Sequence, residues 1–139
     1  MSVDLKERVR KIVQQRNLCS YMNNTKWNEL RTAMMTVMPF PPPYLLKFVF
    51  EDEDVGNKRF YTDVYQLGDW YDVFAIDGAY FNSSFAVEWI KTRPGYLKHR
   101  GKLIEPEIIA AEDIFIDILK KHSISYEEKD GVYCIYGYR

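Results

Sequence analysis

A run of prolines in the first half of the chain most constrains the fold. The segment Pro39-Phe40-Pro41-Pro42-Pro43 cannot lie in a helix or in a central strand, because proline fixes φ and lacks a backbone N–H. We expect this proline run to be a short extended connector that packs against the rest of the domain. It separates a helical N-terminal part from the part of the chain that holds the strands.

Hydrophobic spacing predicts two helices before the proline run. The apolar face of the first helix, over residues 1–16, consists of Leu5, Val9, Ile12 and Val13. The apolar face of the second consists of Trp27, Leu30, Met34, Val37 and Met38. Asn23, Asn24 and Thr25 are candidate N-caps for this second helix, and Pro39 ends it. Since the first helix is amphipathic, we expect it to be docked rather than a free tail.

Aromatic and β-branched residues dominate the middle of the chain and predict strands. Three such runs, 44–51, 59–67 and 70–76, are separated by turn residues and suggest an antiparallel meander. Residues 85–91 alternate and are predicted as a strand, with a short helix starting at Ser83 or Ser84 as the alternative. Residues 92–102, which contain Pro94, Gly95 and Gly101, are predicted as an irregular loop.

A third helix and a hairpin are predicted at the end of the chain. Pro106 suits the first turn of the helix, whose apolar face consists of Ile108, Ala111, Phe115, Ile118 and Leu119. Residues 124–129 and 132–138 flank an Asp130-Gly131 turn, which is typical of a β-hairpin. Together these elements predict an α+β fold in one domain over 1–139, with about three helices on a mainly antiparallel sheet.

Several motifs resemble those of a family of small bacterial proteins of unknown function. They are Met22-Asn-Asn-Thr-Lys-Trp27, Pro39-Phe-Pro-Pro-Pro-Tyr44, Gly68-Asp-Trp70, Tyr96-Leu-Lys-His-Arg-Gly101 and Ile135-Tyr-Gly-Tyr138. The resemblance runs over nearly the whole chain and implies a bacterial, cytoplasmic protein. In size and aromatic content the chain is also similar to immunity proteins of bacterial toxin systems, which are small α+β binders of a toxin domain.

Motif and composition searches predict neither a cofactor nor a metal. The phosphate-binding, dinucleotide-binding and nucleophile-elbow motifs are absent, and two cysteines with two distant histidines, His99 and His122, do not give zinc-ligand spacing. No apolar stretch is long enough to cross a bilayer, and no signal peptide is recognisable, so we expect a cytoplasmic protein. Cys19 and Cys134 are then expected to be small core residues.

Charge is segregated along the sequence although the formal net charge is only −1. Residues 51–77 hold eight acids against two bases, and aromatic residues lie among them. Charge steers encounters between proteins and aromatic rings hold complexes together, so our first hypothesis is a protein-binding module, of the immunity type or another. The predicted partner-binding residues are Asp69, Trp70, Tyr71, Asp72 and Asp77.

Two alternative functions come from other residues. Residues 91–103 hold five basic residues and no acid, which predicts a nucleic-acid or phosphate site at Arg93, Lys98, His99 and Arg100, unless these cations pair within the protein. A small hydrolase or isomerase would need His99 together with one of four aspartates, Asp63, Asp69, Asp72 and Asp77. Asp69 and Asp77 stand beside glycines and are better explained as turn residues, so no catalytic residue is assigned.

Overall fold

The computed structural model describes residues 2–52, 67–76, 83–98, 101, 103–105 and 107–139. The described helices are α1 (Ser2–Gln15), α2 (Asn24–Thr36) and α4 (Glu112–Lys121), with a short 3-10 turn η1 (Ser84–Ala86). The strands are β1 (Tyr44–Phe48), β2 (Val87–Thr92), β3 (Gly95–Lys98), β4 (Glu107–Ala110), β5 (Glu127–Lys129) and β6 (Val132–Tyr136). The predicted α+β class is confirmed. None of the described helices has the length and apolar character that a membrane crossing needs.

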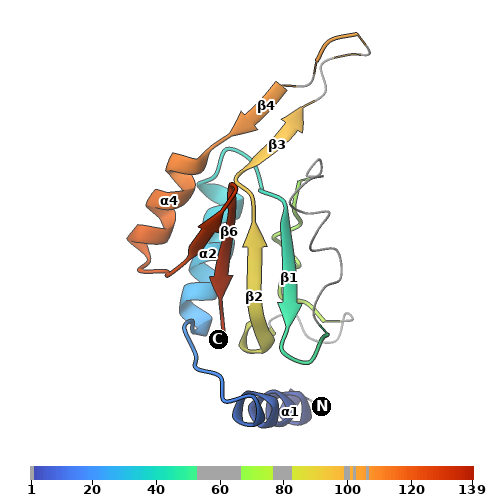
Figure 1. The fold of residues 1–139 in the computed structure, drawn as a ribbon, viewed down its shortest axis with the longest axis vertical. Coiled ribbons are helices and arrows are strands. Elements are labelled where there is room, and N and C mark those ends of the chain that lie inside the picture. The colour runs from blue at the N-terminus through green and yellow to red at the C-terminus, as the bar shows by residue number, and fades with distance from the viewer. Residues whose placement is uncertain (1, 53–66, 77–82, 99–100, 102, 106) are drawn as a thin grey trace.

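Four strands form an antiparallel sheet in the order β1-β2-β6-β5. Figure 1 shows α2 behind this sheet and α1 lying across the lower end of the strands. Ile90 of β2 pairs with Ile135 of β6, and both are buried in one cluster with Leu30 and Met34 of α2. The apolar face predicted for α2 therefore supplies the helical half of the main core.

The ends of two predicted elements follow from local chemistry. The Asn23 side chain accepts a 2.8 Å hydrogen bond from the Lys26 N–H and caps α2, as the sequence predicted. The Asp130-Gly131 turn joins β5 to β6, and both residues have positive φ, which confirms the predicted hairpin. The region 85–91 combines the two readings, because η1 precedes β2 there.

The proline run is a packed connector, as predicted. Pro42 is fully buried. Since prolines have no N–H, the run cannot pair as a strand, and its carbonyl groups accept hydrogen bonds from other parts of the protein instead. The Thr92 hydroxyl and the Arg93 N–H both donate to the carbonyl of Pro43, at 2.9 and 3.2 Å. The connector is thereby held against the end of β2.

Helix α1 is docked by a second apolar cluster and by a buried charge cluster. Val9 packs with Val49 and Ala86, away from the main core. The Lys47 ammonium lies 2.8 Å from the Glu88 carboxylate, and both side chains are only 6% exposed. Arg16, just beyond the end of α1, donates to the same carboxylate. Burial raises the pKa of Glu88, but the hydrogen bonds from Arg16 and Lys47 outweigh it and lower the pKa overall.

Two predicted elements are wrong, and the predicted third helix is present but begins later than expected. Residues 70–76 form bends and a turn instead of a strand, and their buried residues Trp70, Val73 and Phe74 follow a turn-like spacing rather than an alternating one. The region 92–102 holds β3 instead of an irregular loop. The third helix begins at Glu112 rather than near Pro106, because residues 107–110 pair with β3 as β4. The predicted strand 59–67 falls almost entirely outside the described residues.

The two cysteines differ in their surroundings. Cys134 of β6 is buried, as predicted for a small core residue, whereas Cys19 is exposed in the link between α1 and α2, so the core prediction for it is wrong. Both thiols are free. Burial raises the pKa of the Cys134 thiol, which keeps it protonated and unreactive near neutral pH.

Candidate functional site

The predicted partner-binding residues 69–72 form a tight turn on the surface. The Asp69 carboxylate accepts hydrogen bonds from the backbone N–H groups of Tyr71 and Asp72, at 3.2 and 3.3 Å. An aspartate that bonds the backbone two and three residues ahead is a standard turn-forming arrangement. Asp69 is thus the turn residue that the sequence suggested. We call residues 67–72 the Tyr71 turn.

The Tyr71 turn is fastened to the proline connector. The Gly68 N–H donates to the Pro41 carbonyl at 3.1 Å, and the Tyr44 hydroxyl donates to the Asp69 carbonyl at 2.8 Å. A Cβ atom on Gly68 would lie 2.4 Å from the Pro42 carbonyl oxygen, so a glycine is needed for this approach. The backbone of the turn is therefore fixed by contacts on both sides of Asp69.

Trp70 anchors the turn to the core of the protein. Its side chain is 1% exposed, its Nε1 donates to the Pro42 carbonyl at 2.8 Å, and its ring lies 4.8 Å from the ring of Tyr44. The sequence hypothesis needed Trp70 or Tyr71 at the surface, and only Tyr71 is there. Trp70 is therefore a core residue, and its predicted role as a direct contact is corrected to one of support.

Tyr71 is presented at the surface of the turn. Its side chain is 72% exposed, although the preceding residue Trp70 and Val73, two residues further on, are buried. The Arg31 guanidinium of α2 donates two hydrogen bonds to the Tyr71 carbonyl, at 2.8 and 3.2 Å, and lies 5.4 Å from its ring centre. The ring is thus held in place by a neighbouring helix while most of its surface faces solvent.

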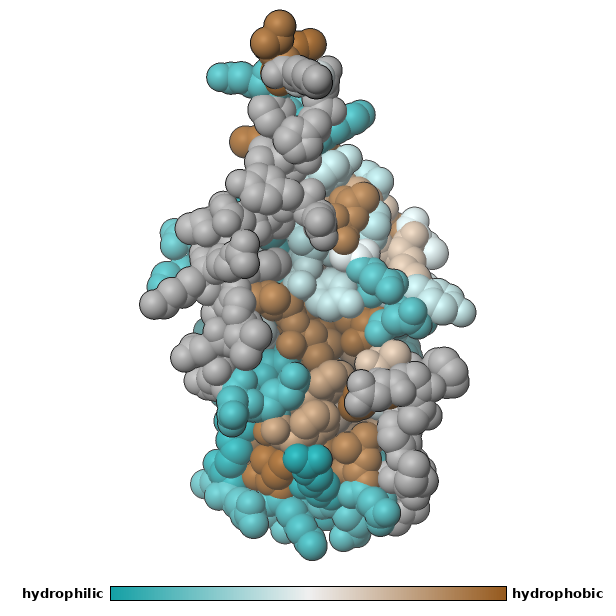
Figure 2. Space-filling model, turned by 90° about the vertical axis from the view of Figure 1, so that its right-hand side faces the viewer, coloured by the Kyte–Doolittle hydropathy of each residue, from teal (hydrophilic) through white to brown (hydrophobic). Residues whose placement is uncertain are grey.

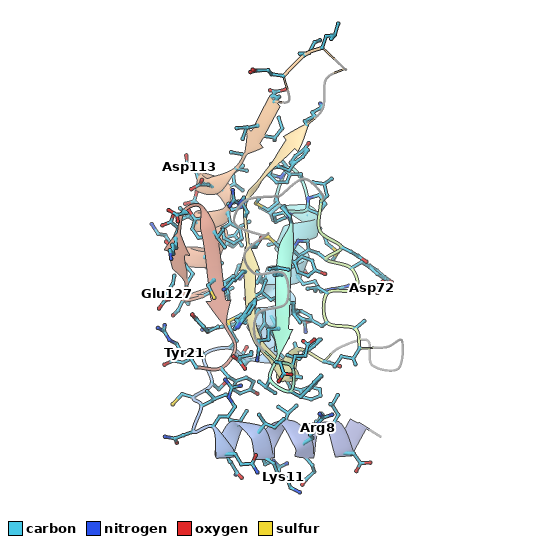
Figure 3. The ribbon with its side chains drawn as sticks, turned by 45° about the vertical axis from the view of Figure 1, so that its right-hand side comes forward. Arg8, Lys11, Tyr21, Asp72, Asp113 and Glu127 are labelled. Carbon is cyan, nitrogen blue, oxygen red and sulfur yellow. The ribbon has the colours of Figure 1, made fainter. Side chains whose placement is uncertain are left out.

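Two carboxylates and one apolar side chain are exposed on the same turn as Tyr71. Asp69 and Asp72 are exposed, and Leu67 is exposed as well. Figure 3 shows Asp72 pointing away from the body of the molecule. Burial, together with the nearby negative charges of Asp69 and Asp72, raises the pKa of Tyr44 to about 12. The surface of the turn is therefore acidic and aromatic. Asp77, the fifth predicted residue, lies outside the described residues.

The predicted anion-binding residues are only partly described. Arg93 precedes β3 and is half-buried, whereas Lys98 ends β3 and is exposed. His99 and Arg100 lie outside the described residues, so the structure does not bring the four together. The nucleic-acid or phosphate site stays a prediction.

The acid–base alternative has no assembled site among the described residues. Asp69 and Asp72 belong to the Tyr71 turn, whereas His99, Asp63 and Asp77 are not described. The other histidine, His122, lies 2.7 Å from the Glu29 carboxylate on the surface. In the described part of the chain no three His, Cys, Asp or Glu side chains are grouped so that they could hold a metal ion.

A small pocket of about 150 Å³ lies on the side opposite the Tyr71 turn. Its lining residues are Tyr21, Ser125, Tyr126, Glu127, Tyr136 and Arg139. The charged groups in this pocket satisfy each other, because Arg139 pairs with Glu127 and its guanidinium lies 4.7 Å from the ring centre of Tyr136. Figure 3 shows Tyr21 and Asp72 on opposite sides of the molecule.

Sequence reasoning missed one prominent surface, the pair of strands β3 and β4. These strands form a separate two-stranded sheet, which we call the arm, and Figure 1 shows it projecting beyond the four-stranded sheet. The arm and its connecting residues expose Leu103, Ile104 and Ile108. The signal was present in the sequence as apolar residues beside a basic segment, but Ile108 was assigned to the core face of a helix.

Comparison with protein families gives one match. Residues 9–139 match the model of a family of unknown function, DUF6678. No curated protein and no solved structure matches the chain. The resemblance to a family of unknown function is confirmed at this level.

Proposed function

The chain belongs to the DUF6678 family, whose function is unknown, and we propose that it is a protein-binding module that binds its partner through the Tyr71 turn. One observation carries the proposal: Tyr71 is 72% exposed on a turn whose neighbouring tryptophan is buried. An exposed aromatic ring on a rigid backbone gives large contact area at a low cost in conformational entropy. This combination is typical of a binding hot spot.

The charges of the turn indicate what kind of protein would bind. Asp69 and Asp72 belong to the same turn as Tyr71, and both are exposed. Acidic groups at the rim of an interface speed the approach of a basic surface and select for it. We therefore propose a partner that offers a basic surface with an apolar recess for the tyrosine ring.

The binding proposal is preferred to the enzyme alternative for a geometric reason. The two described aspartates of the enzyme hypothesis are exposed, and Asp69 already accepts two backbone hydrogen bonds. A catalytic site needs a recess in which acid and base groups converge on a substrate. An exposed acidic surface with an aromatic ring suits contact with another macromolecule better.

The proposal also includes the compartment in which the module acts. Both cysteines are free thiols, which suits a reducing compartment such as the cytoplasm. The bacterial origin and the immunity-type role rest on resemblance and stay predictions.

Affinity capture from the native host tests the proposal. The wild-type chain is used as bait beside Tyr71→Ala and the matched control Tyr21→Ala, which removes an exposed tyrosine from the opposite side. We expect mass spectrometry to identify a protein that the wild type and Tyr21→Ala retain and that Tyr71→Ala loses. Capture of the same proteins by all three baits would contradict the proposal.

A further inference from the structure

Two surface features lie away from the Tyr71 turn. The arm exposes apolar side chains at its far end, as Figure 2 shows, but an apolar surface alone does not specify what binds to it. The pocket of about 150 Å³ on the side opposite the Tyr71 turn is lined by charged, polar and aromatic side chains, which do specify a chemistry. We call it the edge pocket.

The edge pocket lies at a gap along one edge of β6. This strand pairs with β2 along one edge and with β5 along the other, where β5 begins to pair at Glu127. The Gly137 N–H still donates to the Glu88 carbonyl of β2, so the link between α1 and α2 lies on the same edge as β5. The Tyr21 N–H of this link donates to the Gly137 carbonyl at 2.9 Å. Tyr136, which lines the pocket, therefore lies between the two stretches that cover this edge.

Two of the tyrosines that line the edge pocket are held in place by the protein. The Tyr126 ring lies 5.6 Å from the ring of Tyr133, which is buried in the core. Tyr136 is half-buried, and its hydroxyl is hydrogen-bonded with the side chain of Cys134. The negative faces of aromatic rings attract cations, and rings that are already fixed lose little conformational freedom when a cation binds.

The edge pocket already holds a cation from its own chain. The Arg139 guanidinium lies 4.7 Å from the ring centre of Tyr136 and pairs with the Glu127 carboxylate. A guanidinium is planar, stacks on aromatic faces and donates to carboxylates, so a ring beside a carboxylate suits it well. Arg139 therefore indicates which chemical group this site accepts.

Arg139 is weakly held in this position. Its side chain and that of Glu127 are each 54% exposed. An exposed ion pair contributes at most about 1 kcal/mol, so the Arg139 side chain can leave the pocket at little cost. Protein cavities of about 150 Å³ hold a molecule the size of benzene, and a guanidinium group is smaller than benzene.

We propose that the edge pocket binds a guanidinium group of an external molecule, which takes the place of Arg139 beside the Tyr136 ring and the Glu127 carboxylate. In the free protein Arg139 occupies the site and competes with the ligand. An anionic ligand does not suit the pocket, because Glu127 repels it and the charge of Arg139 is already paired.

The edge pocket and the Tyr71 turn are separate sites on opposite sides of the molecule. Tyr21 lines the pocket but does not belong to the turn, so Tyr21→Ala remains a control for binding at the Tyr71 turn. Failure of one proposal therefore leaves the other standing.

A ¹H–¹⁵N NMR titration of the full chain with N-methylguanidinium, at constant ionic strength, tests the proposal. We expect saturable shifts in the millimolar range at the amides of Tyr126, Glu127 and Tyr136. The control ligand N-methylurea has nearly the same shape without the charge and should cause no saturable shift. Unchanged signals from the rest of the chain show that the protein stays folded.

Variants at the two charged positions give opposite results. Arg139→Ala removes the competing guanidinium and should bind N-methylguanidinium about twofold to fivefold more tightly than the wild type. Glu127→Gln removes the counter-charge and should bind it about fivefold more weakly. The matched control is Glu128→Gln, which removes the same charge from the next residue of β5, outside the pocket, and should bind like the wild type.

Three results would overturn the proposal. They are the absence of saturable shifts in both the wild type and Arg139→Ala, equal binding of N-methylurea, and weaker binding by Arg139→Ala, which would make Arg139 itself the ligand-binding group. A parallel titration with N-acetyl-arginine methylamide distinguishes the source of the guanidinium. Tighter binding of this blocked arginine than of N-methylguanidinium assigns the site to an arginine side chain of another protein, and the reverse order assigns it to a free guanidino compound.

Discussion

The Nε1 of Trp70 donates a 2.8 Å hydrogen bond to the carbonyl oxygen of Pro42, and this bond joins the Tyr71 turn to the proline connector. Proline carbonyls in an extended run have no strand partner, so a buried indole N–H is well suited to satisfy one of them. The next residue in the sequence, Tyr71, faces solvent. The two adjacent aromatic residues therefore have different roles. Trp70 fixes the turn from the core, and Tyr71 is exposed on its surface.

Removal of the Trp70 ring should destabilise the protein without acting directly on a binding surface. We expect Trp70→Ala to lower the free energy of unfolding by about 3–5 kcal/mol, because it leaves a cavity and an unpaired carbonyl at Pro42. Urea denaturation measures this change. Tyr71→Ala serves as the comparison and should stay within about 0.5 kcal/mol of the wild type, as exposed substitutions do. Equal losses for the two variants would place Tyr71 in the core.

A methyl group at Gly68 should displace the turn. The new Cβ would meet the Pro42 carbonyl oxygen and the Tyr44 ring, so backbone has to move. We expect Gly68→Ala to cost about 1–3 kcal/mol of stability, in the range of overpacked sites. Loss of the Tyr44–Trp70 ring contact should change the near-UV circular dichroism spectrum as well. A variant as stable as the wild type, with the same spectrum, would show that the turn is not held tightly.

Stability should fall in acid because of Glu88. Its pKa is lowered in the folded protein, so the folded state favours the ionised carboxylate. The resulting stabilisation is fully present above the pKa of an unfolded glutamate and is lost as the pH falls through the lower, folded pKa. Urea denaturation at a series of pH values below neutral measures this loss.

The control for the acid series is Glu88→Gln, which cannot ionise. This variant leaves the buried Lys47 ammonium without its counter-charge, so its stability at neutral pH should be lower by about 3–5 kcal/mol. Its stability should also fall less steeply with decreasing pH than that of the wild type. Parallel curves for the two proteins would mean that other carboxylates cause the acid sensitivity.

Those parts of the fold with strong local signals could be predicted from the sequence. Helix α2 has a capping asparagine at Asn23, and the last hairpin has Asp130-Gly131, so both were predicted near their observed positions. The proline run gave a packed connector because its backbone chemistry allows little else. In each case local residues determine the structure.

The elements that failed depend on contacts between distant residues. β3 and β4 form because Gly95 to Lys98 pair with residues 107–110, and β4 keeps pairing up to Ala111, which delays the start of α4. No local pattern reveals that pairing. Residues 70–76 have the composition of a strand, but their buried residues lie in bends over the core.

The candidate site was predicted in its location but not in its detail. The sequence placed acids and aromatic rings together at residues 69–72, and it identified Asp69 as a turn residue. Which of Trp70 and Tyr71 is exposed depends on where the proline connector passes. The composition of the sequence does not reveal the path of that connector. The arm was missed because the exposure of Ile108 follows from strand pairing.

The dissociation constant of the captured partner, measured by isothermal titration calorimetry, tests the central claim most directly. Wild type, Tyr71→Ala and Tyr21→Ala are compared under one buffer condition. Tyr71→Ala should weaken binding by at least about 2 kcal/mol, as loss of an aromatic hot spot does, whereas Tyr21→Ala should bind like the wild type. Unchanged affinity for Tyr71→Ala, with the variant still folded, would contradict a partner site at the Tyr71 turn.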